Sequence, residues 1–159
     1  MANKTVVNWL EILTNLYFIF RLSPFDAINI KSIKKAQKHY HYDWSLVTNE
    51  GAKFENLVAL HLLKWVHYEQ DTKARNLDLC YFRDADAREV DFIILEDNKP
   101  IIAVECKLKS LEIDKSLIYF KHKFPECRAI QVTAYGEQNF INKDGILCCQ
   151  AIDFLGEFI

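Results

Sequence analysis

The chain has 159 residues, 50% of them hydrophobic and 13% aromatic, which fits one domain with a sizeable core and excludes a disordered segment. Its net charge of −2 gives no overall sign of a nucleic-acid or membrane partner, so a nucleic acid would need a local basic patch. Five cysteines without zinc-ligand spacing, no signal peptide and no apolar stretch as long as a membrane span predict a cytoplasmic protein.

The first part of the chain, residues 1–48, predicts a helix and a hairpin. Apolar residues recur at helical spacing over 5–18, and the sequence continues as a strand at 17–22. Aromatic and polar residues then alternate at 39–44, which predicts a second strand.

The rest of the chain, residues 49–159, predicts an α/β core. Asn49 is a candidate N-cap for a long helix that ends near residue 68. A further helix is expected at 111–123, and strands are expected at 78–83, 89–96, 100–108, 127–134 and 146–150. This order predicts a central mixed sheet flanked by helices, within a single domain that spans 1–159.

The stretch "EVDFIILEDNKPIIAVECKLK" carries charges inside two strands that are otherwise apolar. A three-residue loop, 97–99, would pair Glu96 with Pro100 and place Asp91 directly opposite Glu105. The same register puts Glu89 opposite Lys107, on the face that also holds Asp91 and Glu105. The other face, from Val90 and Phe92 to Cys106, is apolar throughout, so we expect an interior hairpin with a charged cluster at one end.

Two opposed carboxylates repel each other unless they share a proton or a cation. Oxygen ligands of this kind favour Mg²⁺ or Mn²⁺, and Lys107 could orient a water molecule or stabilise developing negative charge. These groups suit metal-dependent hydrolysis of phosphodiesters. The alternative is structural: Glu89 and Lys107 form a cross-strand salt bridge, Asp91 caps a strand end, and Glu105 lies in solvent.

Several motifs resemble known families. The segments "EVDFII" and "IIAVECKLK" resemble the Asp…Glu-x-Lys core of the PD-(D/E)XK nuclease-like superfamily, which has the restriction-endonuclease-like fold. A closer resemblance is to the domain of unknown function DUF4143, which usually follows an AAA-type ATPase domain. It is carried by "TVVNWLEILTNLYFIFRLSPF", "KAQKHYHYD", "GAKFENLVALHL", "YFRDADAREVDFII", "VECKLKS" and "DKSLIYFKHKF".

The resemblance implies a restriction-endonuclease-like core with catalytic Glu55, Asp91, Glu105 and Lys107. It also implies a divalent cation, Mg²⁺ or Mn²⁺, held by Asp91, Glu105 and the main-chain carbonyl of Cys106. Glu55 has an equally weighted alternative, because a carboxylate within one turn of a helix start complements the helix dipole.

Basic residues provide the candidate nucleic-acid contacts. Lys31, Lys34, Lys35 and Lys38 lie close together in "KSIKKAQK", and Lys109 would extend the patch from the Lys107 side. The alternative is an ordinary solvated face.

The leading function is a metal-dependent nuclease-like domain that hydrolyses nucleic-acid phosphodiesters. The runner-up is a non-catalytic domain that binds nucleic acid or protein as an accessory of an AAA-type ATPase. The sequence contains no GxxxxGK[ST] nucleotide-binding loop, so an ATPase would be a partner, and a homo-oligomer is a third arrangement.

Overall fold

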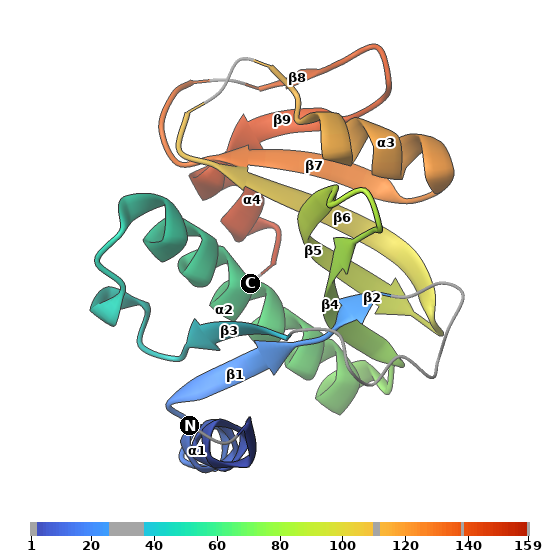
Figure 1. The fold of residues 1–159 in the computed structure, drawn as a ribbon. Coiled ribbons are helices and arrows are strands. Elements are labelled where there is room, and N and C mark those ends of the chain that lie inside the picture. Colours follow the sequence, from blue (N-terminus) through green and yellow to red (C-terminus); the bar gives the residue numbers. More distant parts are fainter. Residues whose placement is uncertain (1–2, 26–36, 110–111, 138, 159) are drawn as a thin grey trace.

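The computed structural model of the protein describes residues 3–25, 37–109, 112–137 and 139–158 (Figure 1). The chain begins with helix α1 (Asn3–Asn15). Strands β1 (Ile19–Leu22) and β3 (Lys38–His41) then pair antiparallel as a small separate sheet. The predicted N-terminal helix and hairpin are confirmed.

The main sheet has seven strands and is mixed, as predicted. The inner pair β5–β6 is antiparallel, whereas β6–β7 and β7–β9 are parallel. Its strands, in spatial order, are β2 (Pro24–Phe25), β4 (Leu77–Arg83), β5 (Glu89–Glu96), β6 (Lys99–Lys107), β7 (Arg128–Thr133), β9 (Leu147–Gln150) and β8 (Phe140–Ile141).

Helices cover both faces of this sheet (Figure 1). Helix α2 (Glu50–Lys73) and the short α4 (Ala151–Gly156) pack in one hydrophobic cluster with Phe92 and Ile94. Helix α3 (Lys115–Lys123) packs in a second cluster with Ile93. Alternate residues of β5 therefore serve opposite cores, which explains why both of its faces are apolar.

One residue departs from this alternation. Val90 belongs to the cluster beneath α3 with Ile93, although its position in the strand predicted the face of Phe92. The pairing of β4 with β5 shifts register between Cys80 and Phe82, and Val90 is the partner of Phe82 immediately after the shift.

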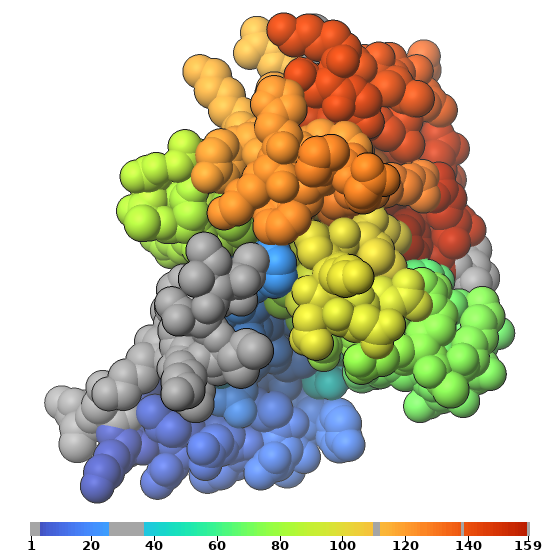
Figure 2. All heavy atoms as spheres, turned by 90° about the vertical axis from the view of Figure 1, so that its right-hand side faces the viewer, coloured from blue at the N-terminus to red at the C-terminus, as the bar shows by residue number. Residues whose placement is uncertain are grey.

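The turn between β5 and β6 differs from the expected three-residue loop. It consists of Asp97 and Asn98, both with positive φ (49° and 63°), and Glu96 pairs with Lys99 instead of Pro100. Positive φ at both central residues is typical of the type I′ turns that match strand twist. A register shift then restores the predicted pairing of Phe92 with Val104. The tip of this hairpin faces the viewer in Figure 2 (yellow).

Helix boundaries follow from capping and ion pairs. The side chain of Asn49 accepts the N–H of Ala52 at 3.0 Å, which confirms the predicted N-cap of α2. The helix continues beyond the expected end at 68. Its last turn is stabilised by an ion pair between Glu69 and Lys73 (2.6 Å), four residues apart, which a search for apolar periodicity does not detect.

The short elements were missed, namely β2, β8, α4 and the 3₁₀ turn η1 (Trp44–Leu46). An element of two or three residues, or a helix of fewer than two turns such as α4, carries too little periodicity to be recognised in a sequence. Of the described helices, none combines the length and apolar character needed to cross a membrane.

Candidate active site

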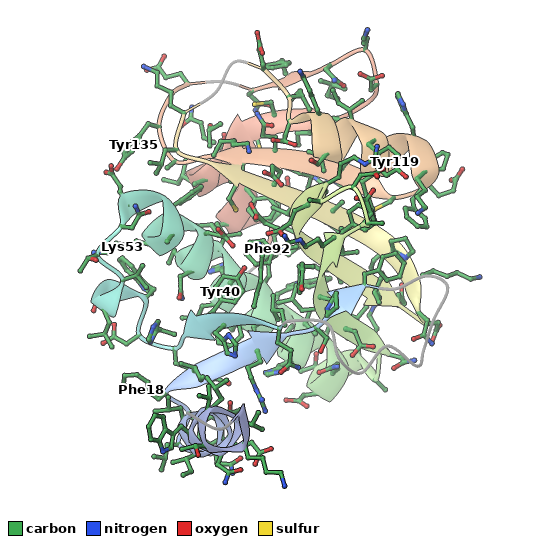
Figure 3. The ribbon with its side chains drawn as sticks, in the orientation of Figure 1. Phe18, Tyr40, Lys53, Phe92, Tyr119 and Tyr135 are labelled. Atoms are coloured by element: carbon green, nitrogen blue, oxygen red, sulfur yellow. The ribbon has the colours of Figure 1, made fainter. Side chains whose placement is uncertain are left out.

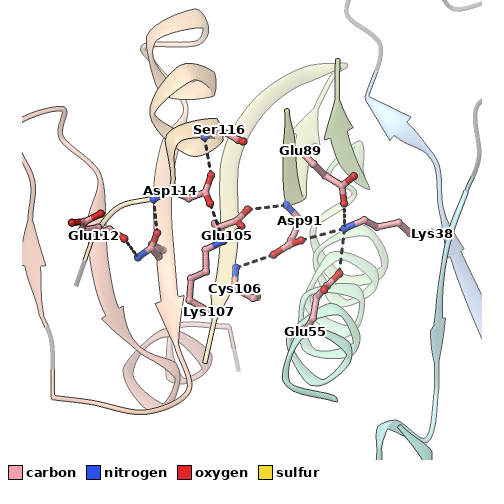
Figure 4. Close-up of polar contacts among 11 residues, drawn as sticks. Lys38, Glu55, Glu89, Asp91, Glu105, Cys106, Lys107, Glu112, Asp114 and Ser116 are labelled. Atoms are coloured by element: carbon pink, nitrogen blue, oxygen red, sulfur yellow. Dashed lines mark hydrogen bonds and ion pairs between the residues drawn. The ribbon is translucent and has the colours of Figure 1, made fainter. Parts of the chain in front are cut away.

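The site begins where the ladder between β5 and β6 ends. Beyond the pair Phe92–Val104, main-chain N–H groups donate to side-chain carboxylates and no longer to carbonyls of the neighbouring strand. The N–H of Cys106 donates to Asp91 Oδ2 at 3.0 Å, and the N–H of Asp91 donates to Glu105 Oε2 at 3.4 Å (Figure 4). Because main-chain amides shielded from water need acceptors, this arrangement holds the two carboxylates beside each other, as the sequence predicted.

A lysine from the N-terminal sheet lies among the acidic residues. Lys38 Nζ is 2.7 Å from Glu89 Oε1, 3.2 Å from Asp91 Oδ1 and 3.3 Å from Glu55 Oε1 (Figure 4). Its side chain is only 22% exposed, so the ammonium is an internal counter-ion of the cluster.

Strand β3 is held against α2 by Asn56. The buried side-chain amide of Asn56 accepts the N–H of His41 at 2.8 Å and donates to the His41 carbonyl at 2.7 Å. Residues 38 and 40 share a strand face, so docking β3 in this way brings both Lys38 and Tyr40 to Glu55. The Tyr40 hydroxyl donates to Glu55 Oε1 at 2.6 Å.

Glu55 is thus part of the cluster. It is the sixth residue of α2 and lies in the second turn, so the expectation that it falls within one turn of the helix start is wrong. The helix dipole acts mainly on the first turn, which leaves the ion pair with Lys38 and the bond from Tyr40 as its main contacts.

Lys107 lies on the other side of Glu105. Its Nζ is 2.7 Å from Glu105 Oε1 and 2.8 Å from Asp114 Oδ2. Asp114 is the N-cap of α3 and accepts the N–H of Ser116 at 2.7 Å. The structural alternative of a Glu89–Lys107 bridge is wrong, because Glu89 pairs with Lys38 and, at 3.7 Å, with Arg83. Its exposed Glu105 is also wrong, because Glu105 is buried. Its third part is confirmed, because Asp91 accepts the N–H of Cys106 at the strand end.

Burial shifts the acid–base properties of these groups. It raises the pKa of Glu105 to about 8, assisted by the nearby charge of Asp91 and opposed by Lys107. Burial also raises the pKa of Asp91, with Glu55 adding to the effect and Lys38 opposing it. For Lys38 and Lys107, burial lowers the pKa but the surrounding carboxylates outweigh it, so both pKa values are raised and both amines stay charged. The carboxylate pair therefore favours a bound proton or an added cation.

Comparison with known proteins identifies the family. Residues 50–152, more than half of the chain, match the family described as "Domain of unknown function (DUF4143)". The chain belongs to the DUF4143 family. Residues 1–55 match a second family, described as "Domain of unknown function (DUF8612)". Asp91, Glu105 and Lys107 lie within the DUF4143 match, Lys38 and Tyr40 lie in the DUF8612 match, and Glu55 lies in both.

One curated relative extends the comparison. "Uncharacterized protein MJ1544" of Methanocaldococcus jannaschii is 23% identical over 148 residues, which cover 88% of this chain and 32% of the relative. The chain therefore spans about a third of the length of this relative. No solved structure matches the chain.

The donor set of this DUF4143 domain can be compared with the needs of a divalent cation. Asp91 and Glu105 supply oxygen ligands of the kind that Mg²⁺ and Mn²⁺ prefer, and burial raises the pKa of both carboxyl groups. Within the described ranges, however, no three acidic, histidine or cysteine side chains are grouped closely enough to hold a metal. Glu55 and Asp91 are instead bridged by the ammonium of Lys38. The ligand chemistry fits, but Lys38 contacts Oδ1 of Asp91 and Lys107 contacts Oε1 of Glu105.

The basic residues of the sequence prediction have different positions. Lys31, Lys34 and Lys35 lie outside the described residues. Lys38 is directed into the acidic cluster, whereas Lys109 is exposed just beyond β6. Lys38 is therefore engaged by carboxylates and does not present its ammonium on an open surface.

Sequence reasoning missed the roles of Lys38, Tyr40, Glu89 and Asp114. Two signals were available in part. Tyr40 lies in the strand expected at 39–44 and Lys38 comes two residues before it, so a strand that begins at 38 puts both on one face. An aspartate before a helical segment is a typical N-cap. Neither signal identifies the residues of other elements that these side chains contact.

Proposed function

We propose that this DUF4143 domain is a metal-dependent, nuclease-like domain of restriction-endonuclease-like type that hydrolyses nucleic-acid phosphodiesters. The observation that supports the proposal is the geometry of one corner of the sheet. Half-buried Asp91 and buried Glu105 lie side by side, and the ammonium of Lys107 is 2.7 Å from Glu105. An acidic pair that favours added positive charge, next to a fixed ammonium, suits the attack of water on a phosphate.

Each residue has a separate role in this proposal. Asp91 and Glu105, with the main-chain carbonyl of Cys106, would hold Mg²⁺ or Mn²⁺, which supplies an activated water and charge stabilisation when bound. Lys107 orients the attacking water or stabilises the phosphate charge that develops. Asp114 fixes Lys107 by an ion pair of 2.8 Å, so that the ammonium stays near the reacting groups.

A hollow beside the cluster gives room for a small part of a substrate. It has a volume of about 530 Å³ and shares Lys38, Glu55 and Glu89 with the site. The other lining residues are Gln37, His39, Tyr40, His41, Val47, Ala52 and Asn56. Exposed Lys109 and the lysines at 31, 34 and 35 remain the proposed contacts to the phosphate backbone. The five cysteines are free, which agrees with a proposed cytoplasmic location.

A second candidate function rests on α1. Its residues Val6, Trp9 and Ile12 are exposed. The residues Leu16, Tyr17 and Phe18, which follow the helix, are exposed as well. Contiguous apolar side chains of this kind favour a protein contact. A non-catalytic accessory role beside an AAA-type ATPase, or contact with a second copy, would use this helix.

The test is cleavage of supercoiled plasmid, single-stranded DNA and RNA by the full chain with Mg²⁺ or Mn²⁺. We expect Asp91→Asn and Glu105→Gln to abolish cleavage. Asp78→Asn, an exposed aspartate on β4, is the control for loss of one negative charge and should cleave as the wild type does. Cleavage that persists in Asp91→Asn, or none of any substrate with either metal, contradicts the proposal and leaves the accessory role.

A further inference from the structure

Lys38 has no role in the proposed hydrolysis, although it makes the most ion pairs in the site. One amine from β3 contacts Glu89 and Asp91 on β5 and Glu55 on α2, at 2.7–3.3 Å. Divalent cations bind through carboxylate oxygens of this kind. The ammonium and a metal ion would therefore use overlapping sets of atoms.

Asp91 shows the overlap most directly. Its Oδ2 accepts the N–H of Cys106 at 3.0 Å, and its Oδ1 is 3.2 Å from Lys38 Nζ. A cation bound to Asp91 through the oxygen that is not held by the main chain would lie next to the ammonium. Like charges at that separation repel, and the side chain of Asp91 is only 13% exposed, so solvent screens the repulsion weakly.

We propose that Lys38 is a resident counter-ion that competes with the divalent cation, so that metal binds the carboxylates only when the Lys38 ammonium withdraws. This inference rests on the metal site of the proposed function and adds a residue that sets its affinity. Lys38 lies outside residues 50–152, the part that matches DUF4143, and inside the match of residues 1–55. The N-terminal strand therefore controls the occupancy of a site built mainly from the other segment.

The structure offers the ammonium a place to go. Lys38 lines the hollow of about 530 Å³ beside the cluster, together with Gln37 and His39. A lysine has a flexible four-carbon stem, so a change of rotamer can carry the charge into this space while β3 stays in place. The withdrawn ammonium would then lie in the hollow that the proposed function assigns to the substrate.

The first test is calorimetric titration with Mn²⁺ at constant ionic strength. Lys38→Met keeps most of the stem and removes the charge, and Lys64→Met, an exposed lysine on α2, is the matched control. We expect Lys38→Met to bind Mn²⁺ at least about tenfold more tightly than the wild type. Lys64→Met should be unchanged. Equal or weaker binding by Lys38→Met, or no binding by any of the three proteins, overturns the inference.

The second test needs no variant and so does not depend on the folding of Lys38→Met. Wild-type protein is acylated with an amine-specific reagent with and without Mn²⁺, and labelling of each lysine is followed by peptide mass spectrometry. We expect Mn²⁺ to raise the labelling rate of Lys38 several-fold and to leave Lys64 unchanged. An unchanged or slower rate at Lys38, when calorimetry shows that Mn²⁺ binds, overturns the inference.

The outcomes separate this inference from the nuclease proposal. Cleavage that is lost in Asp91→Asn, with unchanged Lys38 titration and labelling, removes only the counter-ion role. Tighter Mn²⁺ binding by Lys38→Met without cleavage of any substrate removes only the nuclease function.

Discussion

The main-chain N–H of Asp91 donates to Oε2 of Glu105, so a side chain of β6 serves as acceptor where the ladder with β5 ends. Asp91 in turn accepts the N–H of Cys106, the residue that follows Glu105. Each carboxylate is thus tied to the main chain of the neighbouring strand. The two groups cannot move apart to relieve their repulsion without breaking these bonds, so relief must come from a proton or a cation.

The first prediction concerns pH and stability. The pKa of Glu105 is about 8 in the folded chain and 4.5 ordinarily, so between these values the folded state holds more protons than the unfolded state. The free energy of unfolding without metal should therefore fall as pH rises from about 4.5 to about 8. Urea melts in EDTA across this window measure the slope. Glu105→Gln should show a shallower slope, and a slope equal to that of the wild type would contradict the assignment.

The second prediction concerns Lys107→Met. Loss of an ammonium that stabilises charge in the transition state should reduce cleavage by about 10²–10³-fold, while Mn²⁺ affinity is retained. Plasmid nicking and calorimetry on the same preparation measure the two quantities. Lys64→Met, an exposed lysine on α2 that has no part in the site, serves as the control. A variant that melts at a lower temperature yet cleaves at the wild-type rate would restrict Lys107 to a structural ion pair.

The third prediction concerns Glu55→Gln. If Glu55 helps to hold the metal, directly or through water, the variant should lose most of the stabilisation that metal gives. That gain is about 2.7 kcal/mol for the wild type when free metal is a hundred times its dissociation constant. Melting curves with EDTA and with Mg²⁺ provide the comparison. Glu50→Gln, in the first turn of the same helix, should cost about 0.3–1 kcal/mol regardless of metal. The same behaviour in Glu55→Gln would remove Glu55 from the site.

The fourth prediction concerns Tyr40→Phe. The Tyr40 hydroxyl donates to Glu55 at 2.6 Å, and its ring packs 5.6 Å from that of Phe92 between β3 and the main sheet (Figure 3). The variant keeps the ring contacts but loses a hydrogen bond to a charged group, which should cost about 1.5–3 kcal/mol in the free energy of unfolding. Tyr42→Phe is the matched control, because the rings of Tyr40 and Tyr42 both pack on Phe20. Tyr42 is the less buried of the two. Equal losses in the two variants would show that the bond to Glu55 contributes little.

The hairpin could be predicted from the sequence because its information is local. Strand β5 has the predicted bounds, Glu89–Glu96, and Phe92 pairs with Val104 in the predicted register. Alternation fixes which residues share a face, and the partners are only about a dozen residues apart. The predicted turn has three residues and the observed turn has two. The register shift between Ile94 and Leu95 compensates for the missing residue, so the pairing beyond it agrees with the prediction.

The position of Lys38 could not be predicted in the same way. Its partner Asp91 lies 53 residues later in the chain, and periodicity states which way a side chain faces but not which element packs there. In the sequence Lys38 belongs to a run of lysines, which is typical of a solvated face. The hydrogen bonds between Asn56 and His41 hold β3 on α2, and this position directs Lys38 to the carboxylates and not to solvent.

The two family matches cover residues 1–55 and 50–152, but the hydrophobic core spans both segments. Phe20, Leu22 and Tyr40 belong to the same hydrophobic cluster as Phe54 and Phe92. A cluster that spans both segments makes them one cooperative unit, so heating should give a single transition in which the calorimetric and van't Hoff enthalpies agree. Amide hydrogens of β1 and β3 should then exchange only by global opening, as slowly as those of β5. Helix α1, whose apolar side chains are largely exposed, should exchange by separate local opening.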